Sequence, residues 1–196
     1  MTSYAKTDTL IGAALSPMDM TRTVSIVIAF SLFNAIAAQL AIPIGPVPIT
    51  MQTFAVTLTG ALLGPRLGAA ALITYLIEGA VGLPFFAEGR AGIGTLLGPT
   101  GGYLVSFPAA AYITGAFSEH GWDRHFLTAV AAMAIGSVVI LLAGWSWLVV
   151  GLGAAPLAAF KAGVAPFLIG DVVKIVLAAA VLPTGWALLK RKASGH

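Results

Sequence analysis

The sequence contains no cysteine, which excludes disulfide bonds, iron–sulfur ligation and thiol catalysis. It has only three histidines and no His-Glu-x-x-His segment, so few side chains are available for a metal centre. Charged residues are also scarce, at 9% of the 196 residues against roughly 25% in soluble domains. These shortages argue against a soluble metalloenzyme, and we expect no metal, no cofactor and no catalytic residue.

What the chain has in abundance is apolar side chains. Hydrophobic residues make up 59% of the sequence, and the mean hydropathy is +0.98. This composition predicts an integral membrane protein surrounded by a lipid bilayer. The net charge of +3 does not indicate a nucleic-acid partner, because the basic residues are scattered singly between apolar segments. The N-terminal segment has no basic region ahead of its short apolar run, so it is not typical of a cleaved signal peptide.

Six apolar segments are separated by stretches rich in glycine and proline, and a helix needs about 20 residues to cross a bilayer. The expected fold is all-α: a six-transmembrane-helix bundle with a glycine-rich outer loop between the third and fourth helices. We expect a tail over residues 1–23, one membrane domain over 24–189 and a basic tail over 190–196. The expected spans are Val24–Ile42, Ile49–Leu63, Leu67–Leu83, Gly101–Ser118, Phe126–Gly151 and Pro166–Leu189.

The lysines and arginines predict the orientation, since they accumulate on the cytoplasmic side of membrane proteins. With both termini inside the cell, most of the ten basic residues face the cytoplasm. The exceptions are Arg90 and Lys161 on the outer side and Lys174 within a span. We therefore expect a multi-pass protein of the bacterial plasma membrane with both termini cytoplasmic.

The last expected span carries two opposite charges, Asp171 and Lys174, three residues apart. This spacing puts both side chains on one helix face. Insertion scales assign each charge a cost of roughly 2.5 to 3.5 kcal/mol near the membrane centre. The pair could be a mutually neutralised structural element, but ionisable residues inside a membrane usually mark a functional site. A lysine donates hydrogen bonds and an aspartate accepts them, so the pair predicts a site for a ligand with both kinds of group.

The loop between the third and fourth spans contains seven glycines from Gly82 to Gly102. Glycines allow a backbone to approach a ligand closely. A phosphate-binding loop is excluded because no lysine stands where that motif requires one. A flexible connector is the alternative, but the length of the loop and its Phe85, Phe86 and Arg90 favour a lid or binding loop.

Uncharged polar residues occur in the first two spans. Thr50, Gln52 and Thr53 stand at the start of the second span, where they either reach a ligand or bond neighbouring helices. Asn34 and Gln39 in the first span are expected to form interhelical hydrogen bonds.

The first span also has Ala37 and Ala41 four residues apart. Small residues at this spacing let another helix approach closely in a membrane. The pair predicts a contact surface for a partner protein.

Several motifs, taken in order, resemble those of the BioY family of biotin transporters. They are "PVPITMQT", "LLGPRLGA", "GAVGLPFFA", "LLGPTGGYLVSF" and "FLIGDVVKIVLA". Members of that family are the substrate-capture (S) components of energy-coupling-factor vitamin transporters. The resemblance extends from about Val24 to Leu189 and implies a six-helix bundle that binds biotin near the outer face.

The resemblance also implies roles for particular residues. Asp171 and Lys174 match the charged positions of the last-span motif, and Arg90 is the candidate for the basic position in the family's loop. Tyr103, in the "GPTGGYL" motif, joins Thr50 and Gln52 among the expected substrate-binding residues.

The implied partners are a transmembrane coupling protein and two ATPase subunits. Ala37 and Ala41 resemble the family's small-residue contact with the coupling protein. ATP hydrolysis is expected only in the separate subunits, and self-association is left open.

Two other function classes remain as alternatives. An intramembrane enzyme acting on a lipid would need converging acid–base groups, for which Glu78, Glu88 and Asp171 are the only candidates. A small-solute channel would need polar residues at one depth on several spans, and the fourth and fifth spans have few. Biotin suits the residues better, because its ureido ring, apolar bicycle and anionic tail call for an acceptor, a donor or cation, and apolar walls.

Overall fold

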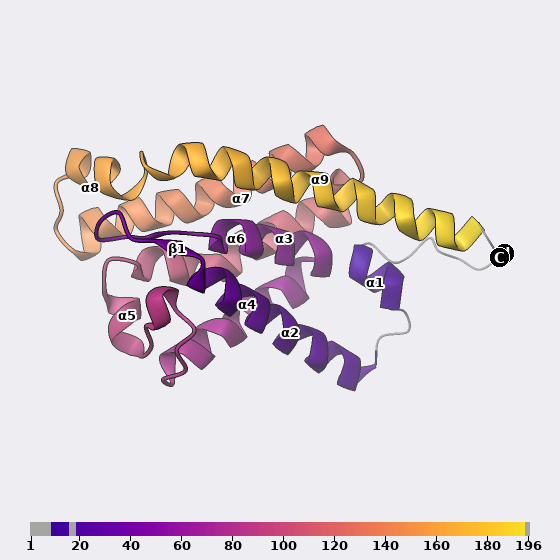
Figure 1. The fold of residues 1–196 in the computed structure, drawn as a ribbon, viewed down its shortest axis with the longest axis horizontal. Helices are drawn as coiled ribbons and strands as arrows, with labels where there is room; N and C mark the ends of the chain where they lie inside the picture. Colours follow the sequence, from indigo (N-terminus) through magenta and orange to yellow (C-terminus); the bar gives the residue numbers. More distant parts are fainter. Residues whose placement is uncertain (1–8, 16–18, 195–196) are drawn as a thin grey trace.

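The computed structural model describes residues 9–15 and 19–194, and their fold is mostly helical (Figure 1). The amino-terminal half holds α1 (Leu10–Leu15), α2 (Met20–Gln39), β1 (Ala41–Ile42), β2 (Ile49–Thr50), α3 (Gln52–Leu63) and α4 (Pro65–Ala80). The remainder holds η1 (Ala87–Gly89), α5 (Ile93–Leu97), α6 (Gly101–Glu119), η2 (Trp122–Arg124), α7 (Phe126–Ser146), η3 (Trp147–Gly151), α8 (Pro156–Gly163) and α9 (Phe167–Ser194).

Three of the described helical segments are long and apolar enough to cross a bilayer. They are Met20–Gln39, Phe126–Gly151 and Phe167–Leu189. The apolar helix α3 has 12 residues, so at 1.5 Å per residue it is only about 18 Å long. The helical membrane character predicted from composition is therefore confirmed. The number of six membrane crossings stays a prediction.

The boundaries of the first two expected spans are wrong. Helix α2 starts at Met20, where Asp19 accepts a 2.8 Å hydrogen bond from the Arg22 backbone N–H, and it ends at Gln39. The chain then forms a short antiparallel ribbon in which Ala41 pairs with Thr50. The proline and glycine residues of "IPIGPVP" form the turn of this ribbon, since proline cannot continue a helix.

Parts of the two expected tails are helical, and the bounds of the tails stay a prediction. Helix α1 lies within the expected N-terminal tail and packs on α3 and α9. Helix α9 continues without a break from the membrane segment to Ser194. The rest of these tails, residues 1–8, 16–18 and 195–196, lies outside the described part of the chain.

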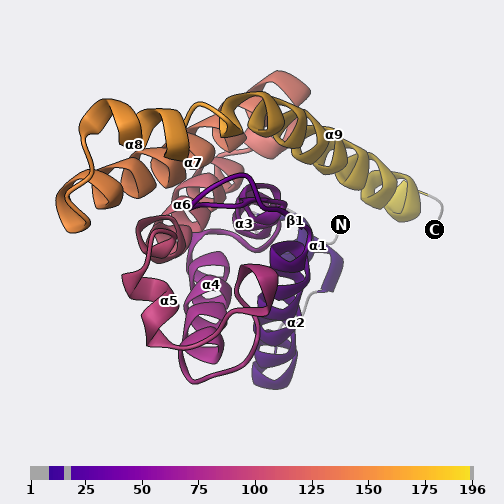
Figure 2. The ribbon, with the colours of Figure 1, turned by 60° about the vertical axis from the view of Figure 1, so that its left-hand side comes forward.

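Helix α6 lies at the centre of the fold, between α7 on one side and α3 and α4 on the other (Figures 1 and 2). Small residues make this position possible. A Cβ atom added to Gly60 of α3 would lie 2.2 Å from the Ala111 carbonyl oxygen of α6. One added to Gly115 would lie 2.4 Å from the Gly64 carbonyl carbon. Close backbone approach of this kind is the usual way that helices associate in lipid, where apolar surface alone gives no drive.

Helices α7 and α9 pack against each other along one side of the molecule, and α2 and α4 form the opposite side (Figure 2). Helix α9 also contacts α3, and a hydrogen bond from Thr53 to Asp171 joins the starts of the two helices. The segment between α4 and α6 folds into η1 and α5 rather than remaining an unstructured connector. These elements surround one end of α6, where the pocket is found.

Candidate functional site

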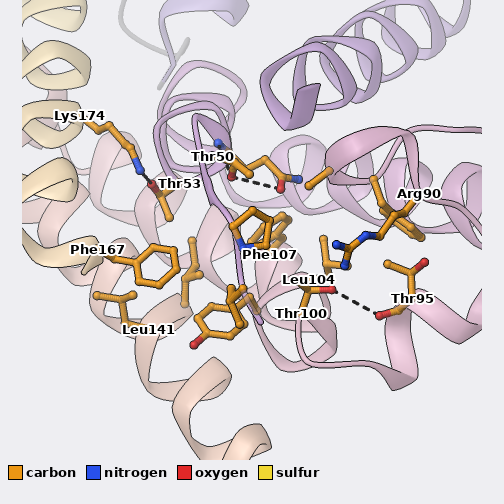
Figure 3. Close-up of a pocket in the computed structure, with 17 residues that line it drawn as sticks. Thr50, Thr53, Arg90, Thr95, Thr100, Leu104, Phe107, Leu141, Phe167 and Lys174 are labelled. Atoms are coloured by element: carbon orange, nitrogen blue, oxygen red, sulfur yellow. Dashed lines mark hydrogen bonds between the residues drawn. The ribbon is translucent and has the colours of Figure 1, made fainter. Parts of the chain in front are cut away.

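A pocket lies where the β2–α3 junction, the η1–α5 segment, α6, α7 and the start of α9 meet (Figure 3). Most of the side chains that line it are apolar or uncharged, and Arg90 and Lys174 are its two cations. The lining residues are Val47, Pro48, Thr50, Gln52, Thr53, Phe86, Ala87, Arg90, Thr95, Thr100, Tyr103, Leu104, Phe107, Ile140, Leu141, Phe167 and Lys174.

Aromatic rings form much of the pocket wall. Tyr103 and Phe167 stack with their ring centroids 6.2 Å apart and their planes at 29°. Phe107 stacks in a similar way on Tyr75, at 6.4 Å and 25°. Such rings are rigid and largely apolar, so they can hold the flat, apolar part of a ligand with little loss of conformational entropy.

Lys174 belongs to a buried polar cluster at one side of the pocket. Its Nζ atom donates to Asp171 Oδ1 at 3.1 Å and to Thr53 Oγ1 at 3.1 Å. Thr53 in turn donates to Asp171 Oδ1 at 3.0 Å, and Ser137 donates to Asp171 Oδ2. The side chains of Lys174 and Asp171 are only 8% and 5% exposed. Each charge thus has an opposite charge and several hydrogen bonds, which offset part of the cost of burying it in an apolar bundle.

Only one of the two charged residues in the cluster lines the pocket. Lys174 and Thr53 line the pocket, whereas Asp171 lies behind them against Ser137 of α7. Contact of Asp171 with a ligand, expected from the sequence, stays a prediction. Asp171 is placed to orient Lys174 through their 3.1 Å bond. Ser137 was not predicted, because it is a lone polar residue in a long apolar span.

Arg90 lies on the other side of the pocket from Lys174 (Figure 3). It follows η1 in the segment between α4 and α6, and its side chain is 46% exposed. The guanidinium group forms an ion pair with Glu88, which has a left-handed backbone conformation with φ of 62°. The segment is therefore a structured binding-loop candidate, and its arginine is far more accessible to solvent than Lys174.

The remaining expected site residues line the pocket but already bond to the protein. Gln52 is 5% exposed, and its Nε2 atom donates to the Tyr75 hydroxyl at 2.8 Å. Thr50 Oγ1 donates to Gln52 Oε1 at 3.3 Å. The Tyr103 hydroxyl donates to the Gly163 carbonyl at 2.7 Å. These bonds fix the shape of the pocket. Direct contact of Thr50, Gln52 and Tyr103 with a ligand stays a prediction.

Polar residues outside the pocket have structural partners. Asn34 donates to Thr59 Oγ1 at 3.0 Å, which confirms the interhelical bond expected for it. Gln39 bonds to the segment between α4 and α6, where its partners are Phe86 and Gly89 at the two ends of the short helix η1, rather than to another long helix of the bundle. Glu78 accepts a hydrogen bond from Ser31, which joins α4 to α2.

The two alanines expected at a partner contact do not share a helix face. Ala37 lies in α2 and is 5% exposed, whereas Ala41 lies beyond the end of α2, in β1. The geometric premise of a small-residue pair on one helix is therefore wrong. Their contact with a partner protein stays a prediction. Within the described residues, no group of three or more acidic or histidine side chains could hold a metal ion.

Comparisons with known proteins agree on one family. A sequence model of the BioY family matches residues 6–191. A Pyrococcus horikoshii protein named probable biotin transporter BioY is 43% identical, over 80% of this chain and 91% of its own length. The biotin transporter BioY of Rhodobacter capsulatus is 38% identical, over 84% of this chain and 93% of its own.

A solved structure supports the same assignment. The crystal structure of the S-component for biotin from an ECF-type ABC transporter superimposes with a TM-score of 0.76 and 25% identity. The match covers 85% of this chain and 93% of that one. The sequence motifs, the helical fold and these relatives lead to one conclusion: this chain belongs to the BioY family.

Proposed function

We propose that this protein captures biotin in the pocket described above and serves as the substrate-binding component of an energy-coupling-factor transporter. The observation that carries the proposal is the arrangement of the pocket, with a buried lysine cluster on one side, an accessible arginine on the other and aromatic walls between. Biotin has a matching order of groups: a polar ureido ring, an apolar bicycle and a carboxylate tail. The relatives named above are transporters, which favours this function over the intramembrane enzyme.

The two cations differ in burial, and this difference sets the orientation of the ligand. The ureido group is neutral, so it can enter the buried cluster, where Lys174 donates to its carbonyl and the oxygens of the cluster accept from its N–H groups. A carboxylate is much more costly to remove from water. We therefore place the carboxylate beside Arg90, whose side chain is 46% exposed. The bicycle then lies between the two, against the aromatic walls.

A titration of purified protein tests this orientation. Arg90→Gln should weaken binding of biotin about tenfold, but leave an uncharged biotin amide nearly unaffected, because only the former has the carboxylate. Lys174→Gln should weaken both ligands. Lys161→Gln is the matched control, since Lys161 is an exposed lysine on α8 outside the pocket. Unchanged biotin affinity in both pocket variants would refute the assignment.

The membrane topology is part of the proposal. We propose six crossings by α2, α3, α4, α6, α7 with η3, and α9, with both termini in the cytoplasm of a bacterial cell. Support comes from the positive-inside distribution of basic residues. Because the chain has no cysteine, single cysteines report cleanly: Ala155→Cys should react with a membrane-impermeant thiol reagent in intact cells, and His120→Cys should not. The reverse pattern would overturn the orientation.

The coupling protein and two ATPase subunits are proposed partners. The solved relative is described as part of an ECF-type ABC transporter. The sequence has no phosphate-binding lysine motif, so another chain must hydrolyse ATP. Co-purification with these subunits is the test. Ala41→Leu, at a half-buried position, should weaken it, and Ile42→Leu, at a more exposed neighbouring position, serves as control.

A further inference from the structure

Gln39 has an unusual set of partners at the end of α2. Its Nε2 atom donates to the carbonyl oxygens of Phe86 at 3.1 Å and Pro84 at 3.3 Å. Its Oε1 atom accepts from the Gly89 backbone N–H at 3.0 Å. One side-chain amide thus bridges both ends of the turn formed by residues 84–89. Gln39 is an exposed residue, so its role is in these bonds and not in core packing.

The turn that Gln39 holds is strained and leads directly to Arg90. Glu88 and Gly89 both have a positive φ, of 62° and 69°. A left-handed conformation is unfavourable for glutamate and persists only where the surroundings enforce it. The turn is closed by a 3.0 Å bond from the Phe86 N–H to the Arg90 carbonyl. On its inner side, Phe86 is 1% exposed and packs edge to face on Tyr75. Gln39 supplies the corresponding attachment on the outer side.

We infer that Gln39 is a positioning residue that fixes the turn so that Arg90 faces the pocket. This inference rests on the proposed function, in which Arg90 binds the carboxylate of the ligand. Without the amide, the turn loses its outer attachment and opens locally at low cost in free energy. The ligand must then order the turn when it binds, and this reduces its affinity. The effect should be confined to ligands that use Arg90.

Selectivity between two ligands tests the inference in the purified full-length protein. Gln39→Ala should weaken biotin binding about tenfold and biotin amide binding by less than about twofold. In an Arg90→Gln background, the further change Gln39→Ala should have no effect on biotin, because both changes remove one interaction. The control is Ile36→Ala, one turn earlier on α2 at an exposed apolar position, which should bind both ligands normally. Equal loss for both ligands, or additive losses in the double variant, would overturn the inference.

Trypsin cleavage after Arg90 provides a readout that needs no ligand. If Gln39 holds the turn, Gln39→Ala should be cleaved there about tenfold faster than the unchanged protein, because cleavage follows the population of the open form. Cleavage after Arg66, which is exposed but remote from Gln39 in sequence and lies on α4, should not change. An unchanged rate at Arg90 would refute the attachment even if biotin binds. Failure of the unchanged protein to bind biotin would refute the proposed function. The cleavage rates after Arg90 would still show whether Gln39 holds the turn.

Discussion

The buried pair of Asp171 and Lys174 makes a quantitative prediction about stability. Asp171→Asn keeps the shape of the side chain but removes the charge that faces Lys174 Nζ at 3.1 Å. Lys174→Met keeps most of the length of the lysine and leaves the aspartate without a cation. Removing one partner of a buried ion pair typically costs about 3 kcal/mol, because the other charge remains uncompensated in a low-dielectric interior.

The double variant should behave differently from the sum of the single ones. With neither charge present, the site resembles an ordinary buried polar position, and we expect a stability within about 1 kcal/mol of the original. Two independent losses of about 3 kcal/mol would give about 6 kcal/mol, so the double variant should be more stable than additivity predicts by about 5 kcal/mol. Such a difference is large enough to measure in detergent.

Thermal unfolding at a fixed heating rate is the assay, since membrane proteins often unfold irreversibly. For a chain of this size, 3 kcal/mol corresponds to a fall of about 6–12 °C in the apparent Tm. Each single variant should show this fall, and the double variant should show little. Lys161→Met, at an exposed lysine, controls for the general loss of a positive charge. If the falls of the two single variants simply add in the double variant, the two charges are not coupled and our account of the cluster fails.

Two further predictions concern packing and pH. Gly60→Ala should lower the apparent Tm by an amount equal to about 2–3 kcal/mol, because its Cβ atom would lie 2.2 Å from the Ala111 carbonyl oxygen; Gly94→Ala, with open space around the new atom, should have no such effect. Burial raises the pKa of Asp123 above its ordinary value of 3.8, although a hydrogen bond from Trp186 opposes this. The folded protein therefore holds this proton more tightly than the unfolded chain, and the associated stability is present below pH 3.8 and lost as the pH rises through the raised pKa. Unfolding measured against pH should show this loss, and an Asp123→Asn variant that keeps the same slope would contradict it.

Local sequence was enough to predict the membrane character, the helical fold and the shared face of Asp171 and Lys174. Composition alone decides whether a chain is more stable in lipid or in water, and a spacing of three residues places Asp171 and Lys174 on one face whatever surrounds the helix. The motifs then identified the family. These features depend on residues close together in the sequence, so no knowledge of the tertiary structure was needed.

Which polar groups meet across the bundle depends on how the helices pack, and local sequence does not contain that information. Ser137 reaches Asp171 over 34 residues, and Gln39 reaches Gly89 over 50. Helical periodicity gives the face on which a residue lies but not the helix that will pack there, so neither contact was predicted. The end of α2 was missed for a related reason: Ala41 is a good helix former, yet pairing with Thr50 places it in a strand. The site thus combines charges that local spacing brings together with partners that only helix packing can supply.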